Sequence, residues 1–591
     1  MKNQIDGSRS SQSHKFAGMR KISLLLVLLP LIFFADAQTV PSIIGPDKMV
    51  DPWHYTSVKS LTFDKACVAS AHPIASNVGA AIMRKGGNAF DAMIAVQLTL
   101  AVVYPEAGNL GGGGFLIARK RDGKLVALDY REMAPGSATK DMYLDKNGNA
   151  QNELSESGHL SSGVPGTVAG IFETYKHAKL PFAQLIQPAI DLAQNGYAIS
   201  KREANGLNGN KADFVKNSTA PAALVKDAPW KEGDTLRQPE LAATLIRIRD
   251  QGLKGFYEGE TAKLIVEEMK RGKGIITLDD LKGYVVKERT PMEFDYRGHH
   301  IIGFPPPSSG GILIEQMLKM IEKYPVGSYG FQSPESVQLM IEAERRAYAD
   351  RAEHMGDPDF WKVPQKTLVS DAYLAERMKD FQPGVASKSA GIKAGIAHES
   401  EETTHISIID KLGNMVAVTT TLNNSYGSKT IVGGAGFIMN DEMDDFSIKP
   451  GVPNMYGAVG GEANAIAAGK RMLSSMTPTL VLKNNNPFMV VGTPGGTTIP
   501  TSVFQSIVNV IDFGMSANDA VNKPKFHHQW LPDEVMVEKG FSPETKAALE
   551  KMGYSIKDRG AIGRTELIKV LATGKREAAA DGRGDDSLAG F

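Results

Sequence analysis

Two threonines at one end of a predicted β-hairpin are the first candidates for chemistry in this sequence. The segment THISIIDKLGNMVAVTTT has alternating apolar and polar residues on either side of a short turn, which is typical of two antiparallel strands. A loop formed by residues 411–413 places Thr403 opposite Thr421, whereas a loop of two or four residues places Thr403 opposite Leu422. In both registers the hydroxyl groups of Thr403 and Thr421 come close together at the open end of the hairpin.

A threonine hydroxyl is a weak nucleophile unless a neighbouring base accepts its proton. The sequence has no Gly-x-Ser-x-Gly elbow, so a Ser-His-Asp site of that class is not indicated. The α-amino group of Thr403 would be a suitable base, since the reference pKa of such a group is about 7.7–8.0. This role requires a cut before Thr403, and the polar segment 384–402 is typical of a flexible linker that can be cut. The hairpin alone leaves open that Thr403 merely begins a strand.

The N-terminus has the pattern of a signal peptide over residues 1–37. Basic residues from Lys15 to Lys21 precede the apolar segment 22–34, and the small residues of Ala35-Asp36-Ala37 follow it. The apolar segment is shorter than the roughly 20 residues that span a bilayer. An uncleaved membrane anchor is the alternative. We predict an exported protein, periplasmic or secreted, with no stable membrane insertion once the signal is removed.

Composition excludes several classes of function. The chain has 591 residues, with 66 basic and 66 acidic side chains, so nothing indicates a nucleic-acid partner. The length suits two or more average domains or one large layered enzyme. Cys67 is the only cysteine, which excludes an intrachain disulfide and a cysteine-based metal site. Its apolar surroundings predict a core strand.

Ahead of Thr403, the predicted elements are mainly helices. Asn88 and Asp91 can cap a helix that is apolar almost all round and therefore buried. Asp122-Gly123 marks a hairpin turn between two strands. Residues from about 165 to 350 are expected to be mostly helical, ending in a helix that begins after Ser333.

After Thr403, strands alternate with helices to the end of the chain. The segments PTLVLK and PFMVVGTP read as strands, and TTIPTSVFQSIVNVIDFG reads as the helix that follows them. No repeat of 20–50 residues is present, which excludes solenoids and propellers. Sheets bracketed by helices predict an α/β enzyme of layered αββα type in which both halves of the chain build one core.

Several motifs in order resemble the γ-glutamyltransferases (γ-glutamyl transpeptidases) of bacterial secreted type. They include NLGGGGF, DYREMAP, TTHISIID, MNDEMDDFS, RMLSSMTPT and GTPGGTTIPTSV, and the resemblance runs from about residue 58 to the C-terminus. It implies an N-terminal-nucleophile hydrolase with a four-layer αββα sandwich. It also implies a precursor that cuts itself between Glu402 and Thr403. The expected products are a large subunit, residues 38–402, and a small catalytic subunit, residues 403–591, which stay associated.

The resemblance and the chemistry of a γ-glutamyl substrate together assign the other site residues. Thr403 is the expected nucleophile, and the hydroxyl of Thr421 would hold it in the attacking orientation. A forked guanidinium and two hydroxyls suit the substrate α-carboxylate, while oxygen atoms suit the α-ammonium group. The residues expected in these two roles are Arg131, Ser474 and Ser475 for the carboxylate, and Asn423, Glu442 and Asp445 for the ammonium group.

Two further features complete the expected site. The backbone N–H groups of Gly495 and Gly496 are expected to stabilise the oxyanion that forms during acyl transfer. The Gly/Pro-rich segment 449–466 is expected to be a lid with Tyr456 at its tip. Without the resemblance, a surface or structural ion pair is the more common role for a residue such as Arg131. The acidic cluster lacks the spacing of a calcium loop, so neither a metal nor an organic cofactor is expected.

The implied reaction is covalent transfer of the γ-glutamyl group from glutathione or a related amide. Water, an amino acid or a dipeptide would then take the group from the acyl-enzyme. Two alternatives stay open, a cephalosporin (glutaryl) acylase of the same superfamily and an exported binding protein that never matures. The partners expected of the enzyme are therefore small-molecule substrates, together with the association of its own two subunits.

Overall fold

The structure is a computed structural model that describes residues 40–220, 222–392, 403–449 and 461–591. The predicted signal peptide, Glu402 and Tyr456 lie outside these residues. Residues 41–591 form one compact unit, to which the following description applies. Among the described helices, none is long and apolar enough to cross a membrane.

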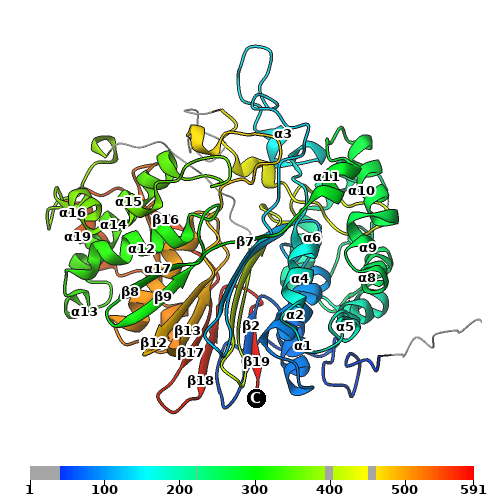
Figure 1. Ribbon diagram of the computed structural model, residues 1–591. Helices are drawn as coiled ribbons and strands as arrows, with labels where there is room; N and C mark the ends of the chain where they lie inside the picture. The colour runs from blue at the N-terminus through cyan, green and yellow to red at the C-terminus, as the bar shows by residue number, and fades with distance from the viewer. Residues whose placement is uncertain (1–39, 221, 393–402, 450–460) are drawn as a thin grey trace, which may run out of the picture. The chain divides into compact units, whose positions relative to one another are not determined.

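Two antiparallel sheets of seven strands each lie face to face between layers of helices (Figure 1). In spatial order, the sheet that holds Thr403, hereafter the β10 sheet, contains β19 (Ser587–Gly590), β2 (Cys67–Ser70), β10 (Thr404–Ile409), β11 (Met415–Thr421), β3 (Gly113–Arg119), β4 (Leu125–Asp129) and β7 (Lys287–Glu288). The other, hereafter the β13 sheet, contains β1 (Ser60–Phe63), β18 (Arg576–Ala580), β17 (Glu566–Val570), β13 (Asn486–Gly492), β12 (Thr479–Lys483), β9 (His299–Gly303) and β8 (Met292–Tyr296).

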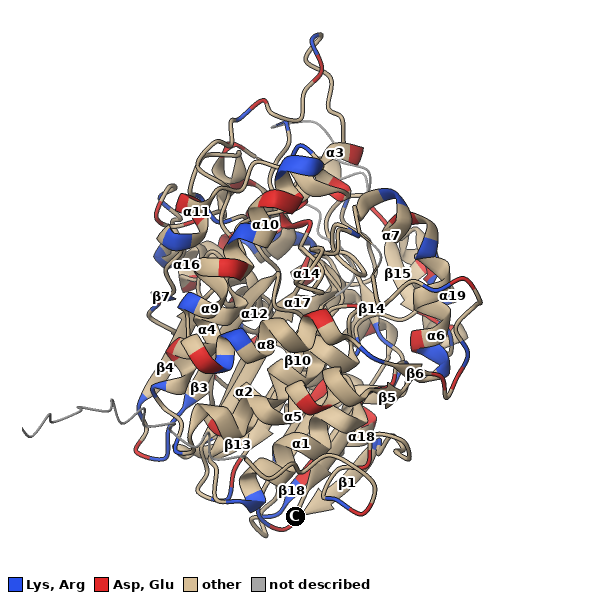
Figure 2. Ribbon diagram, turned by 90° about the vertical axis from the view of Figure 1, so that its right-hand side faces the viewer, with Lys and Arg blue, Asp and Glu red and all other residues tan. Residues whose placement is uncertain are grey.

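Helices cover the outer face of each sheet, which gives the predicted αββα order of layers (Figure 1). The β10 sheet is covered chiefly by α1 (Pro73–Arg84), α2 (Ala89–Val103), α4 (Thr167–Tyr175), α5 (Phe182–Asn195), α8 (Pro239–Gln251) and α10 (Gly259–Arg271). The β13 sheet is covered chiefly by α12 (Gly310–Glu322), α14 (Pro334–His354), α17 (Thr498–Ile511), α18 (Ala517–Asn522) and α19 (Pro543–Met552). Acidic and basic side chains are interspersed along outward-facing helices such as α8 and α10 (Figure 2).

The remaining elements are short and lie in the connections. The helices are α3 (Glu153–Glu156), α6 (Lys201–Gly209), α7 (Lys211–Asn217), α9 (Lys254–Tyr257), α11 (Leu278–Gly283), α13 (Val326–Tyr329), α15 (Gln365–Leu368) and α16 (Asp371–Met378). The strands are β5 (Tyr197–Ala198), β6 (Thr235–Leu236), β14 (Phe526–His527), β15 (Val535–Glu538) and β16 (Ile556–Arg559).

Alternate side chains of β10 pack into two different apolar cores. Ile406 and Ile408 point to the outer face and pack in the same apolar cluster as α2, whereas Ile409 points between the sheets. Helix α2 is buried along its whole length, and Asn88 and Asp91 form the predicted capping box at its start. The strand that follows Thr403 is thus fixed from both faces.

The edge of the β13 sheet differs from the sequence prediction. Residues 165–350 were expected to be mostly helical, yet β8 and β9 form a hairpin within this range. Arg297 and Gly298 both have positive φ, +45° and +72°, as the tight turn between paired strands requires. The buried-exposed alternation of β8 was the available signal for this strand.

The predicted linker over residues 384–402 is ordered in its first half. Ser389 is fully buried, and its carbonyl accepts a hydrogen bond of 3.1 Å from the Trp530 indole. The Ser389 backbone N–H donates to Asp533 at 2.9 Å. The prediction of a flexible linker is therefore wrong for residues 384–392, and its second half, residues 393–402, lies outside the described residues.

Both sheets contain strands from either side of Thr403. Strand β10 pairs with β2, far upstream, and with β11, while β19 at the C-terminus pairs with the other edge of β2. In the β13 sheet, β12 pairs with both β9 and β13. A cut before Thr403 would therefore leave every ladder of hydrogen bonds intact.

Candidate active site

The hairpin that carries Thr403 has the register of a three-residue loop. Thr404 pairs with Thr420 and Ile409 with Met415, which confirms the pairing that places Thr403 opposite Thr421. The Thr403 hydroxyl donates to the Thr421 hydroxyl at 3.4 Å, and only 4% of Thr403 is exposed. The alternative registers, which place Leu422 opposite Thr403, are wrong.

The glycine-rich segment after α2 holds Thr421 by close backbone approach. A Cβ atom at Gly112 would overlap the carbonyl oxygen of Thr421, so only glycine fits there. The Asn109 side-chain amide donates to the same carbonyl at 2.9 Å. The Thr421 hydroxyl also accepts from the backbone N–H of Asn423 at 2.8 Å. The glycine-rich segment therefore packs closely against the backbone of Thr421.

A track of polar side chains runs along the inner face of the same hairpin. The His405 ring bonds to the Thr419 hydroxyl at 2.8 Å through Nδ1 and to the Ser407 hydroxyl at 3.1 Å through Nε2. It also lies directly against Gly492 at the end of β13. Burial lowers the pKa of His405 to about 3, so this imidazole is neutral near pH 7.

The packing of His405 against Gly492 indicates on which side of Thr403 the segment with Gly495 and Gly496 lies. Side chains two apart along a strand share a face, so Thr403 points to the same side as His405, toward the chain that follows Gly492. Gly495 and Gly496 have φ of +131° and +55°, a conformation that favours glycine. Their carbonyls accept from the first N–H groups of α17, at 3.0 Å each.

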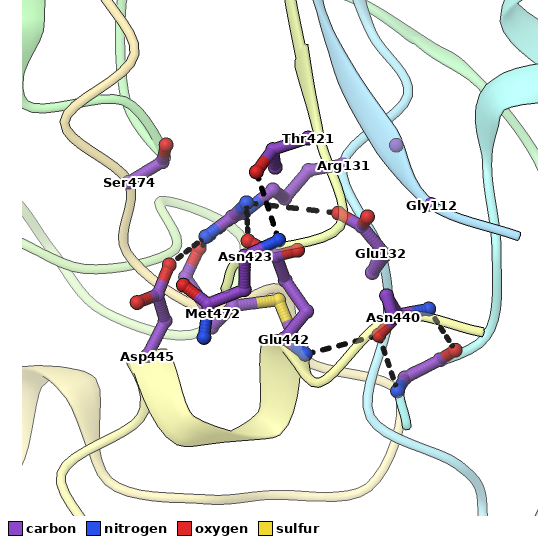
Figure 3. Close-up of polar contacts among 12 residues, drawn as sticks. Gly112, Arg131, Glu132, Thr421, Asn423, Asn440, Glu442, Asp445, Met472 and Ser474 are labelled. Carbon is purple, nitrogen blue, oxygen red and sulfur yellow. Dashed lines mark hydrogen bonds and ion pairs between the residues drawn. The ribbon is translucent and has the colours of Figure 1, made fainter. Parts of the chain in front are cut away.

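An ion cluster lies beside Thr421 and includes three of the predicted binding residues (Figure 3). The two terminal nitrogens of Arg131 pair with Glu442 and with Asp445. Glu132 lies 3.6 Å from the same guanidinium, and all four side chains are almost entirely buried. The predicted carboxylate-binding and ammonium-binding groups are therefore adjacent, as the α-carbon of an amino acid requires.

Burial controls the ionisation of this cluster. It raises the pKa of Glu132 to about 7, although the Arg131 charge opposes the shift. Burial also raises the pKa of Glu442 well above its usual range, and the charge of Glu132 adds to the effect. Burial therefore opposes the ionisation of both carboxyls, while the Arg131 guanidinium favours it.

The other predicted binding residues lie on the loops around this cluster. Asn423 adopts φ of +79°, and its side-chain amide donates to the Asp441 carbonyl at 3.1 Å. Ser474 accepts from the Met476 backbone N–H at 3.2 Å, and Ser475 is fully buried beside it. Figure 3 shows Ser474 on the loop that also carries Met472, whose carbonyl accepts from Arg131 Nε at 3.4 Å.

Two residues of the cluster were missed from sequence. Glu132 directly follows Arg131 in the DYREMAP motif. Asn440 precedes the acidic run, accepts from the Glu442 backbone N–H at 3.1 Å and donates to the carbonyls of Gly111 and Gly163. Both residues lie inside motifs quoted from the sequence, DYREMAP and MNDEMDDFS. A polar residue type within a motif does not distinguish an orienting side chain from a solvated one.

Comparison with known proteins places this site in a family. A family model described as gamma-glutamyltranspeptidase matches residues 75–591. The chain is also 43% identical over 579 residues to a protein of Escherichia coli (strain K12) named glutathione hydrolase proenzyme, covering 97% of this chain and 99% of the relative. The chain belongs to the gamma-glutamyltranspeptidase family. It is accordingly an enzyme of the γ-glutamyltransferase and glutathione hydrolase type.

Solved structures of gamma-glutamyltranspeptidase relatives share the fold. Cephalosporin acylase from Bacillus halodurans superposes with a TM-score of 0.80 at 26% identity, covering 92% of this chain and 99% of that one. A Helicobacter pylori gamma-glutamyltranspeptidase chain superposes with a TM-score of 0.54 at 43% identity, covering 58% of this chain and 96% of that one. The αββα sandwich is thus that of the N-terminal-nucleophile hydrolases, and identity is higher to the transpeptidase than to the acylase.

Proposed function

We propose that this protein is made as a precursor that cuts itself between Glu402 and Thr403 and then transfers γ-glutamyl groups. The observation that carries the proposal is the contact between the Thr403 and Thr421 hydroxyls at the start of β10. In the cut, Thr403 Oγ attacks the Glu402 carbonyl carbon, and the peptide C–N bond breaks as an ester forms. Water then hydrolyses the ester, which leaves a carboxylate on Glu402 and a free α-amino group on Thr403.

The mature site would use that amino group as its base. It takes the proton of Thr403 Oγ as the oxygen attacks the γ-carbonyl carbon of glutathione or a related amide. The N–H groups of Gly495 and Gly496 stabilise the oxyanion, and the amine leaves with the proton. Water, an amino acid or a dipeptide then attacks the ester and releases Thr403 for another cycle.

The ion cluster would recognise the amino-acid end of the substrate. The charged groups of the substrate would replace the ion pairs that Arg131 makes with Glu442 and Asp445. The substrate α-carboxylate takes the guanidinium of Arg131 with the hydroxyls of Ser474 and Ser475, and the α-ammonium group takes Asn423, Glu442 and Asp445. This assignment requires no metal or organic cofactor. The buried acidic pair, Glu442 and Asp445, supports a γ-glutamyl over a glutaryl substrate, since a glutaryl group has no ammonium to offset its charge.

The mature protein would consist of residues 38–402 and 403–591, held together by the shared sheets. The E. coli relative is named a proenzyme, and the H. pylori chain spans 58% of this chain but 96% of its own length, which supports two subunits. We also propose export to the periplasm or beyond, on the strength of the predicted signal peptide, and a lid that includes Tyr456.

The test is to sequence the N-termini of the purified protein and of a Thr403→Ala variant. The wild-type protein should give two fragments, the smaller beginning at Thr403, and should release glutamate from glutathione. Thr403→Ala should remain one uncut, inactive chain. Thr404→Val is the matched control, because its side chain lies on the opposite face of β10, and it should be cut and active. A cut that survives in Thr403→Ala would overturn the mechanism, and faster turnover of a glutaryl than of a γ-glutamyl anilide would indicate an acylase.

A further inference from the structure

A cavity whose wall includes Gly495 is lined by several basic side chains, two of which are ion-paired: Arg202 with Glu106, and Arg583 with Glu538 and Asp581. Its volume is about 500 Å3, and Gly495 and Thr498 form part of its wall. Five basic side chains line it, and Asp558 is the one acidic residue among the described residues that do so. The basic residues are Arg202, Lys557, Arg559, Arg564 and Arg583.

The wall of this cavity is fixed to the segment that carries the proposed oxyanion donors. Strand β17 pairs with β13 so that Glu566 lies opposite Gly492, which brings the chain before β17 alongside the chain after β13. The Arg564 backbone N–H donates to the Thr493 hydroxyl at 2.8 Å. A Cβ atom at Gly563 would meet the same hydroxyl at 2.6 Å, so the two segments are in direct contact.

The two arginines nearest this junction are held in defined positions. Arg564 donates to the Tyr104 hydroxyl, and its guanidinium lies 5.4 Å from the centre of that ring. Arg559 is only partly buried, and its terminal nitrogen lies 2.9 Å from the Met536 sulfur. A guanidinium fixed in this way needs little reordering to bind a carboxylate.

Two buried carboxyl groups, those of Glu566 and Asp586, interact with the charge of Arg564. Burial and the neighbouring Asp586 charge raise the pKa of Glu566 well above its usual range. Burial likewise raises the pKa of Asp586, with Arg564 opposing the shift. Burial thus opposes the ionisation of both carboxyls, while the Arg564 guanidinium favours it.

We propose that this cavity binds the carboxylate at the far end of the leaving group, which in glutathione is the glycyl carboxylate. The inference rests on the proposed function, in which Gly495 marks the position of the bond that breaks. A dipeptide leaving group extends at most about 7 Å beyond that bond, so a carboxylate at its end falls within reach of a cavity that begins at Gly495. Glutathione would then be held at each end by a guanidinium, Arg131 at one and Arg559 with Arg564 at the other.

The test compares glutathione with its glycyl ethyl ester, which lacks only the terminal negative charge. The measured quantity is the ratio of kcat/KM for the acid to kcat/KM for the ester. Arg559→Gln should lower this ratio about tenfold, the effect of losing one charge-assisted hydrogen bond. Arg564→Gln should do the same, and Arg559→Lys should restore part of the ratio. The matched control is Arg576→Gln, at the start of β18 and paired with the far end of β17, which should keep the wild-type ratio.

Each outcome decides a different question. A wild-type ratio in Arg559→Gln, with both substrates still turned over, would overturn the carboxylate site and leave the proposed function standing. No release of glutamate from either substrate by the wild-type protein would overturn the proposed function itself. Because Arg564 is buried and its replacement risks misfolding, the partly exposed Arg559 decides the result.

Discussion

At the scale of single residues, the pocket around Arg131 contains three carboxyl groups, Glu132, Glu442 and Asp445, about one guanidinium. Burial is the main cause that raises the pKa of Glu132 to about 7, and the charge of Asp445 adds to it, whereas Arg131 opposes it. A protonated carboxyl attracts an ammonium group weakly, whereas a carboxylate attracts it strongly. Ligand affinity should therefore follow the ionisation of this cluster.

We expect glutamate, which has the same α-carboxylate and α-ammonium groups as the substrate, to bind more tightly as pH rises through about 7. The sign follows from the raised pKa, since the proton is held below that pH and lost above it. The measurement is the inhibition constant of glutamate from pH 5.5 to 9, which separates binding from the ionisation of the Thr403 amino group.

Glu132→Gln should flatten this dependence. Glu315→Gln is the matched control, because burial also raises the pKa of Glu315 to about 7, yet it lies on α12 in the outer layer of the β13 sheet. An unchanged pH dependence in Glu132→Gln would show that another group governs binding.

At the scale of elements, the glycine before β3 at position 112 is required by close packing, which secondary-structure propensity does not reveal. Gly112→Ala should lower the free energy of unfolding by about 1–3 kcal/mol, because the new methyl group would overlap the Thr421 carbonyl. It should also slow self-cleavage, since the shift displaces Thr421. The measurements are denaturant unfolding and the fraction of cut chain over time. Gly209→Ala, in open space at the end of α6, should change neither, and equal effects at both positions would contradict the argument.

Comparison of the helices and strands with the sequence predictions shows which features could be predicted. The capped helix α2 followed from Asn88 and Asp91. The sequence left the register of the β10–β11 hairpin open between two pairings, and the structure shows the one set by a three-residue loop. The hairpin of β8 and β9 was missed because two short strands inside a helical region give a weak pattern. The contacts of Ser389 with Trp530 were beyond reach, since they join segments distant in sequence. The pKa shifts of Glu132 and Glu442 beside Arg131 likewise depend on burial, which no sequence motif reports.

At the scale of the whole molecule, the two predicted subunits interleave within single sheets. Uncut Thr403→Ala precursor should therefore refold from denaturant with a yield independent of protein concentration, as one chain does. The cut wild-type protein should refold with a yield that falls on dilution, because two separate chains must meet before either sheet can form. Size-exclusion chromatography and glutathione hydrolysis after refolding measure this. Equal yields at all concentrations would contradict the interleaved assembly.

The position of β19 has one more consequence. Its residues, Ser587–Gly590, complete the sheet beside β2, and β2 is the neighbour of the strand that begins at Thr404. The proposed cut before Thr403 thus depends on a strand that lies far downstream of it in the sequence. Such a cut would act as a check on folding, because only chains in which β19 has joined β2 would become active enzyme. A chain that lacks β19 would stay uncut and inert.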